Sequence, residues 1–464
     1  MQEILMRSFS TPQEMASHGR ANPLIRVGSR RWFLQTSAAG IGSLFLPQLL
    51  HLQSTVQASP NSRDGKGDNS KAVILFWLSG GPSHIDMWDP KPTAPSEIRG
   101  PYRTIPTQLT GVRLSEHLPL QASIADKLSI IRSVDCQASD HTPITMQTGN
   151  PLARRTNDGR DGGGYPSMGS IASKFRGAND REMPAFVGLA NSWDADVWEA
   201  GKMGSRHAPV KGHELSGRFE LPAGISVKHL QDRERLRQEL DRFSRQLDNT
   251  RSFDRVDRFT QQAYQMVKSG KVQRAFDLGA ESITTREAYG STSIGEKALL
   301  ARRLVEAGVT FVLVSGAWGY FDHHGDNVRW GGIQQGLTPL LPRVDQVIFA
   351  LVNDLESRGL LDNTLVMMMG EFGRSPMINK DAGRDHWTNV MSMIMAGGGL
   401  NHGQVIGSTD SHGGAIASSP VRPQDLAATT YKHLGVDLNA HWTDPTGRPV
   451  PIVVEGGRPI PELA

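Results

Sequence analysis

Short, continuous apolar runs recur along the chain, and most are separated by stretches with helical periodicity. At least five such runs can be counted, at residues 72–78, 128–134, 309–314, 365–369 and 390–395. Runs of this length, bounded by glycine or turn residues, are typical of parallel strands that are buried on both faces. Their alternation with helices predicts an α/β fold, with a doubly wound, mostly parallel sheet covered by helices on both faces.

Composition is that of an ordinary globular protein. The chain has 464 residues, of which 21% are charged and 38% are hydrophobic, and its formal net charge is only +3. The small excess of basic residues is dispersed, so we expect no nucleic-acid partner. The single cysteine, Cys136, excludes an intramolecular disulfide and a cysteine-based zinc site.

The N-terminus resembles a twin-arginine export signal. Ser29 precedes the pair Arg30–Arg31, and a mildly apolar run of small residues follows at 36–50. That run is too short and too rich in Gly, Ser and Gln to span a bilayer. We therefore expect residues 1–58 to be a signal peptide that is cleaved after Ala58. The mature chain is then exported, to the periplasm or beyond, by the twin-arginine machinery and has no stable membrane span.

The mature chain is expected to hold one main domain. Residues 59–70 have the composition of a flexible linker, and the α/β domain is expected at 71–459. Within it, residues 227–278 are polar with apolar residues at helical spacing, which predicts a helical hairpin inserted into the domain.

Ionisable residues are most concentrated just after the apolar run 365–369. That run ends at Gly370. Several ionisable residues follow within sixteen positions, among them Glu371, Arg374, Asp381, Arg384, Asp385 and His386. Polar groups just past the carboxyl end of a buried strand lie where open α/β sheets keep their active sites. Carboxylates, an Asp-His pair and two arginines suit a metal site that handles an anionic group. The alternative is a loop of ion pairs beside a core strand.

Three other strand ends carry candidate residues. His84 and Asp86 follow the first run and can converge on one ion, or cap a turn and pack against Trp88. Asp322 and His324 follow the third run and form the strongest metal-type pair in the chain.

The second run leads to a predicted helix at 141–148. A hydroxyl or imidazole near its start, such as Ser139 or His141, is suited to binding an oxyanion. The alternative for the polar residues there is N-capping.

Several motifs taken together resemble a known family. They are VILFWLSGGPSHIDMWDPKP from residue 73, YFDHHGDN from 320, GEFGRSP from 370, GRDHW from 383, GGGLNHGQVIGSTD from 397 and DLAATTYKHLG from 425. This pattern looks like the exported family known as domain of unknown function 1501 (DUF1501). The family in turn resembles the alkaline phosphatase and sulfatase superfamily, whose members hydrolyse phosphate or sulfate esters with one or two metal ions.

The resemblance implies roles for individual residues. Counting back from Thr148–Gly149 places Ser139 at the nucleophile position, as a serine or as formylglycine. Asp322 and His324 match the metal-binding Asp-His pair that follows a middle strand. Glu371 and Phe372 stand where a second Asp-His pair is expected, and Asp385 and His386 can supply those ligands instead. The acid that ends the first strand in the superfamily is missing, and His84 or Asp86 can substitute for it.

Two hypotheses follow. In the first, the chain is an exported, metal-dependent hydrolase of phosphate or sulfate esters, acting on a small molecule or a glycan. Zn²⁺ is the expected ion, with Mn²⁺ or Ca²⁺ as alternatives. Ser139 attacks, and Arg374 or Arg384 steadies charge on the non-bridging oxygens. In the second, the chain is a non-catalytic protein on the same fold that binds a metal ion or an anionic glycan.

Overall fold

The computed structural model describes residues 70–137, 141, 144–153, 164–190, 196–211, 269–316, 320–454 and 456–464. The predicted signal peptide at 1–58, residues 59–69 of the linker, Ser139 and residues 227–268 of the predicted helical insertion lie outside this set. The predictions made for those segments therefore stay predictions.

An eight-stranded sheet forms the centre of the described structure, in the order β12-β4-β11-β8-β1-β7-β5-β6. All its strands run in one direction except β11, which is antiparallel to both β4 and β8. The strands are β1 (Ala72–Trp77), β4 (Leu128–Val134), β5 (Phe186–Leu189), β6 (Val210–Lys211), β7 (Phe311–Ser315), β8 (Thr364–Met369), β11 (Met391–Gly397) and β12 (Gln404–Ile406).

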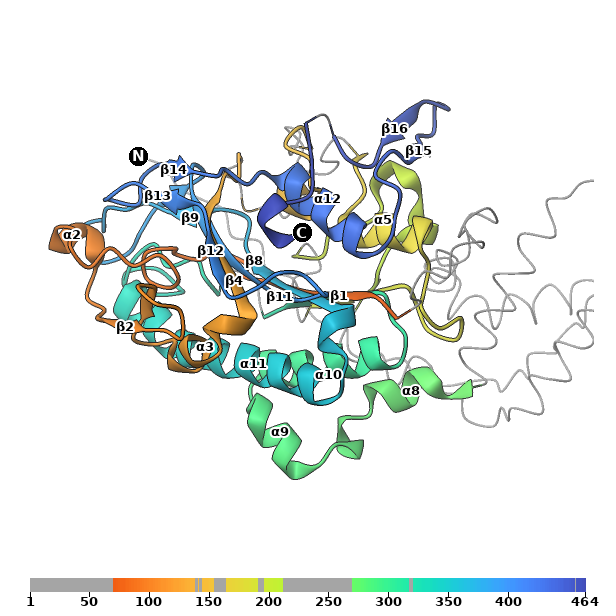
Figure 1. Ribbon diagram of the computed structural model, residues 1–464, viewed down its shortest axis with the longest axis horizontal. Coiled ribbons are helices and arrows are strands. Elements are labelled where there is room, and N and C mark those ends of the chain that lie inside the picture. The colour runs from red at the N-terminus through yellow and green to blue at the C-terminus, as the bar shows by residue number, and fades with distance from the viewer. Residues whose placement is uncertain are drawn as a thin grey trace, which may run out of the picture. The chain divides into compact units, whose positions relative to one another are not determined.

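Helices cover both faces of this sheet (Figure 1). One face carries α4 (Ile144–Thr148), α5 (Met168–Phe175) and α12 (Pro423–His433). The other carries α3 (Pro119–Ser123), α8 (Lys271–Phe276), α9 (Ile283–Tyr289), α10 (Ser293–Glu306) and α11 (Thr338–Ser357). The predicted α/β class and the doubly wound, mostly parallel sheet are confirmed.

Strand β1 shows why an unbroken apolar run is needed here. Successive side chains of a strand point to opposite faces. Ile74 and Phe76 accordingly pack in the hydrophobic core shared with α10 and α11, and Leu75 and Trp77 pack in the core shared with α5 and α12. Because both faces are covered by helices, an alternating apolar-polar pattern would bury polar groups at every second position.

The register of the central strands aligns their carboxyl ends. Trp77 at the end of β1 lies beside Ser315 of β7 on one side and beside Met369 of β8 on the other. The loops that follow these three strands therefore start at the same edge of the sheet. After β8 the chain forms a short ribbon in which β9 (Gly373–Arg374) pairs with β10 (His386–Trp387), with His386 opposite Arg374.

All five predicted strands are present, with ends shifted by up to two residues. Strands β5, β6 and β12 were not predicted, because they contain only four, two and three residues and lack a long apolar run. Among the described residues, no helix combines the length and apolar character needed to cross a bilayer.

Further short elements lie outside the main sheet. They include the helix α2 (Ser96–Arg99) and the ribbon of β2 (Thr104–Pro106) and β3 (Arg113–Ser115). Two C-terminal ribbons pair β13 (Ser408–Thr409) with β14 (Ile416–Ser418) and β15 (His441–Thr443) with β16 (Pro449–Pro451).

Candidate metal centre

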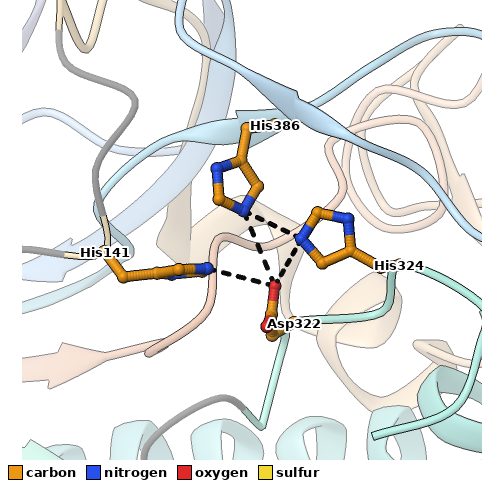
Figure 2. A group of neighbouring side chains, drawn as sticks. All are labelled: His141, Asp322, His324 and His386. Atoms are coloured by element: carbon orange, nitrogen blue, oxygen red, sulfur yellow. Dashed lines mark hydrogen bonds and ion pairs between the residues drawn. The ribbon is translucent and has the colours of Figure 1, made fainter. Parts of the chain in front are cut away.

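Four side chains from three separate segments meet at the carboxyl edge of the sheet. His141, Asp322, His324 and His386 each offer one ligand atom, and these atoms all lie within 4.8 Å of one another. Figure 2 shows the three imidazole rings directed at the carboxylate of Asp322. Within the described residues, this is the one group of three or more His, Cys, Asp or Glu side chains that is arranged to hold a metal ion. We call these four residues the metal cluster.

The topology of the sheet explains why these residues meet. His141 lies between β4 and α4, whereas Asp322 and His324 lie in the segment that follows β7. His386 is on β10, which the chain reaches after leaving β8. The carboxyl ends of parallel strands share one edge, so residues far apart in the sequence converge there.

One oxygen atom, Oδ1 of Asp322, is the centre of the metal cluster. It lies 3.0 Å from Nε2 of His324, 3.3 Å from Nε2 of His141 and 3.7 Å from Nε2 of His386. The two Nε2 atoms of His324 and His386 are 2.9 Å apart. Ligands held at about 2.1 Å in a tetrahedral zinc site lie roughly 3.4 Å from one another, so this spacing suits one small ion.

Charges in and around the metal cluster strongly shift the pKa values of Asp322 and His141. Burial raises the pKa of Asp322, but hydrogen bonds with the three histidines and the charge of Arg374 outweigh that effect and hold the pKa well below its usual range. Burial lowers the pKa of His141, but its hydrogen bonds with Asp322 and Glu371 raise the pKa to about 9. Asp322 is therefore a carboxylate and His141 an imidazolium at neutral pH in the metal-free protein.

Two further carboxylates orient the histidines from outside the metal cluster. Glu371 Oε1 lies 3.1 Å from Nδ1 of His141, and Asp385 Oδ1 lies 3.4 Å from Nδ1 of His324. A carboxylate on Nδ1 holds the proton there and turns the Nε2 lone pair inward, which is the usual support for a metal-binding histidine. Glu371 is also fixed by the backbone N–H of Gly80, which donates to its Oε1 at 2.7 Å.

Arg374 contacts the metal cluster directly, yet its hydrogen-bonding capacity is fully used. A guanidinium has five N–H donors. Those of Arg374 point at the carbonyl oxygens of Gly80, Gly81 and Arg384, at Oδ1 of Asp322 and at Nε2 of His324. The side chain is only 2% exposed. In this arrangement no donor of Arg374 remains for an oxyanion.

Arg384 and Asp86 form a buried ion pair instead of joining the metal cluster. Arg384 Nε and Nη2 donate to the two carboxylate oxygens of Asp86 at 2.7 and 3.0 Å. Its remaining donors reach the carbonyl oxygens of Ser375, Pro376 and Ile98. Both oxygens of Asp86 are therefore engaged, and Arg384 also has no donor left over.

His84 also makes its contacts outside the metal cluster. Its Nε2 lies 2.8 Å from the carbonyl oxygen of Gly413, and the ring is 1% exposed. Burial lowers the pKa of His84, so the ring is neutral. Of the predicted site residues, the structure thus brings together His141, Asp322, His324, Glu371, Arg374, Asp385 and His386, and holds His84, Asp86 and Arg384 in other contacts.

Asp196 was not singled out from the sequence, although it lies at the same edge of the sheet. Ser79, just after β1, donates to its Oδ1 at 2.7 Å, and Ser315 at the end of β7 donates to its Oδ2 at 2.6 Å. Burial raises the pKa of Asp196 to about 6. It thus brings a carboxyl group to the end of the first strand, where the sequence itself has no acid. These partners are 117 and 119 residues away in sequence, and no local motif links them.

The comparison with protein families agrees with the sequence motifs. The model of the family described as "Protein of unknown function (DUF1501)" matches residues 70–464. The chain belongs to the DUF1501 family. This confirms the family predicted from the sequence. No curated protein is detectably similar to the chain.

Solved structures similar to this DUF1501 protein include three with descriptive titles. "Ps i-CgsB" is 13% identical, with 79% of this chain and 72% of that chain covered and a TM-score of 0.37. "PsFucS1 sulfatase from Pseudoalteromonas sp." is 12% identical, with 79% and 68% covered and a TM-score of 0.37. "Phosphonate monoester hydrolase SpPMH from Silicibacter pomeroyi" is 10% identical, with 84% and 74% covered and a TM-score of 0.33.

The donor set of the DUF1501 protein fits a divalent ion. Three imidazole nitrogens and one carboxylate oxygen are ligands that Zn²⁺ accepts, and Mn²⁺ also accepts carboxylate and imidazole. One buried atom beside the metal cluster, Oε2 of Glu371, has no hydrogen-bond partner among the described residues. A buried carboxylate oxygen without a partner is costly in a folded protein, and a bound ion or a catalytic role is one explanation for such an atom.

Gly80 allows the close approach that positions Asp322. Its φ is +109°, and a Cβ at this position would lie 2.4 Å from the backbone nitrogen of Asp322. Gly111 also has a positive φ, +78°, but a Cβ there would meet nothing within 4 Å. Both Gly→Ala changes add backbone strain of about 1–2 kcal/mol, and only Gly80→Ala also displaces Asp322. We expect Zn²⁺ to raise the Tm of Gly111→Ala but not that of Gly80→Ala. Equal responses would contradict this role of Gly80.

The raised pKa of His141 makes the stability of the metal-free protein depend on pH. The folded-state pKa of about 9 exceeds the ordinary value of 6.5. The stabilisation is therefore complete below pH 6.5 and is lost as the pH rises through 9. This change lowers the free energy of unfolding by at most about 3 kcal/mol. Urea denaturation of chelator-treated protein at pH 6 and 9.5 measures it.

His141→Gln is the matched variant for this measurement, because other groups also titrate between these pH values. Burial lowers the pKa of Lys297 to about 8, which has the opposite effect on stability over this range. The difference between the wild type and His141→Gln should shrink from pH 6 to 9.5. A constant difference would show that the His141 pKa is not raised.

Proposed function

We propose that this DUF1501 protein is an exported, metal-dependent hydrolase of phosphate or sulfate esters, with a small molecule or a glycan ester as substrate. The observation that carries the proposal is the convergence of three imidazole nitrogens on one carboxylate oxygen at the carboxyl edge of the sheet. Structural ion pairs do not require three imidazole nitrogens to gather around one carboxylate oxygen, whereas the ligand atoms of a metal centre have to converge on one small volume.

Zn²⁺ is the proposed ion, with Mn²⁺ or Ca²⁺ as alternatives, held by the metal cluster. When bound, such an ion supplies a Lewis acid and lowers the pKa of a bound water. The protein's own contribution is to fix the ligands. Asp385 faces Nδ1 of His324 and favours the tautomer that is protonated there. Glu371 accepts a hydrogen bond from Nδ1–H of His141. Oε2 of Glu371, which has no partner among the described residues, is available to accept a proton from the attacking group.

Ser139 remains the proposed nucleophile. It precedes His141 by two positions in the sequence. A serine hydroxyl in this role would attack phosphorus or sulfur, release the alcohol of the ester and form a covalent intermediate that water then hydrolyses. The oxyanion role proposed for Arg374 and Arg384 receives no support from the contacts of these residues, because the donors of both are occupied. Charge on the non-bridging oxygens then has to be met by the ion itself.

The full use of the Arg374 and Arg384 donors favours the second candidate function, a non-catalytic metal-binding protein on this fold. Proteins commonly bind phosphate and sulfate groups through bidentate hydrogen bonds from arginine, and Arg374 and Arg384 have no free donor for this purpose. The two candidates differ in turnover and not in metal content.

The decisive experiment measures metal content and turnover on the same preparations. Protein purified after export is analysed for divalent metals per chain, before and after loading with Zn²⁺, Mn²⁺ or Ca²⁺, and is assayed with aryl phosphates and aryl sulfates. We expect one ion per chain and ester hydrolysis. Asp322→Ala and His386→Ala should lose the ion and at least about a hundredfold in kcat/KM.

His412→Ala is the matched control, because His412 is exposed and stands outside the metal cluster. It should keep both metal and activity. Metal binding without hydrolysis of either ester class would favour the non-catalytic candidate. Absence of metal from the wild type under all loading conditions would rule out the proposed mechanism.

Export is part of the proposal and has its own test. We expect the Arg30→Lys, Arg31→Lys double variant to remain inside the cell, because the arginine pair is the feature that resembles a twin-arginine signal. Fractionation of cells that express the tagged full chain measures this directly. A double variant that is exported as efficiently as the wild type would contradict the proposed route.

A further inference from the structure

We infer that the guanidinium of Arg374 is a resident cation of the metal cluster, and that it and a divalent ion are alternative partners of the same oxygen, Oδ1 of Asp322. The inference rests on the proposed metal-dependent function, which it deepens. It has two consequences. The natural chain binds its ion more weakly than the four ligands alone would, and Asp322 has to leave Arg374 for the ion to bind.

The position of Arg374 is fixed by the backbone around it. Nε donates to the carbonyl oxygen of Gly81 at 3.0 Å, and Nη1 donates to that of Arg384 at 3.0 Å. Nη2 donates to the carbonyl oxygen of Gly80. Three carbonyls from two segments thus hold a side chain that is 2% exposed. The guanidinium has no solvent to withdraw into when another cation approaches.

Arg374 contacts the atoms that a metal ion requires. Its Nη2 donates to Oδ1 of Asp322 at 2.6 Å, and its Nη1 lies 3.2 Å from Nε2 of His324. The oxygen at the centre of the metal cluster therefore already has a positively charged partner. His324 Nε2, a second ligand atom, faces the same guanidinium.

A divalent ion and this guanidinium cannot share Oδ1 of Asp322 without strong repulsion. An ion about 2.1 Å from that oxygen would lie roughly 4 Å from the guanidinium nitrogen. Like charges at this distance repel strongly in a buried site. Because Arg374 is held by backbone carbonyls, Asp322 is the group that moves.

A supporting role for Arg374 makes the opposite prediction. A residue that merely orients a ligand from outside strengthens metal binding, and its loss weakens binding by about 10- to 100-fold. A competing cation weakens metal binding, so its removal strengthens it. The sign of the change in metal affinity therefore separates the two roles without any reference to catalysis.

The test compares metal affinities of full-length variants by titration against a chromophoric chelator. Arg374→Gln removes the charge and keeps amide donors for the carbonyls, and we expect it to bind Mn²⁺ and Zn²⁺ at least about tenfold more tightly than the wild type. Arg374→Lys keeps the charge and should stay within about threefold of the wild type. Arg422→Gln, which removes an arginine paired with Asp425 on α12, controls for net charge and should also stay within that range.

Equal or weaker binding by Arg374→Gln would overturn the inference. If neither the wild type nor Arg374→Gln binds an ion, the proposed metal-dependent function fails and the competition fails with it. If the wild type binds and Arg374→Gln does not bind more tightly, only the competition fails. If Arg374→Gln alone binds, the competition is supported and the natural chain is not metal-dependent.

A second measurement needs no substitution, in case Arg374→Gln does not fold. A crystal structure of the wild type at saturating Mn²⁺, with the ion located by anomalous scattering, reports the contact directly. We expect the separation between Nη2 of Arg374 and Oδ1 of Asp322 to exceed the hydrogen-bonding limit of about 3.2 Å once the ion is bound. An ion on Oδ1 with that hydrogen bond still in place would overturn the inference.

Discussion

The common direction of the strands is the constraint on which the site depends. Every strand of the central sheet except β11 runs the same way. The register also places the ends of β1, β7 and β8 side by side. Residues after the parallel strands, including β4, therefore gather at one edge, although His141 and His386 are 245 positions apart in the sequence. Buried apolar strands thus fix where the polar chemistry can be placed.

Much of this arrangement can be predicted from the sequence because the strands carry a strong local pattern. Runs such as 72–78 and 365–369 leave little alternative to buried strands, and the polar residues that follow them are then assigned to one edge. This reasoning selected Asp322, His324, Glu371 and His386 before any contact was known. The antiparallel direction of β11 has no such signature, because composition does not record the direction of a strand.

The partners of individual side chains are the part that sequence patterns do not contain. Asp86 and Arg384 both qualified as site residues by type and position, yet each neutralises the other across 298 positions. Asp196 lacked any local motif and still reaches the end of β1 through Ser79. Charged residues near a strand end are equally able to build the site or to hold the loops around it. Only the contacts decide between these uses.

The charges around Asp322 bear on how an anionic ester could be held when Arg374 and Arg384 have no free donor. In the metal-free protein, the carboxylates of Asp322 and Glu371 are balanced by Arg374 and by the imidazolium of His141, whose pKa is raised to about 9. Binding of the proposed divalent ion would add two positive charges and would remove the proton from Nε2 of His141. The net change is one positive charge in a buried site, where electrostatic interactions are strong. Attraction for an anion then arises from loading the ion, so metal binding and substrate binding are expected to be coupled through the charge of the metal cluster.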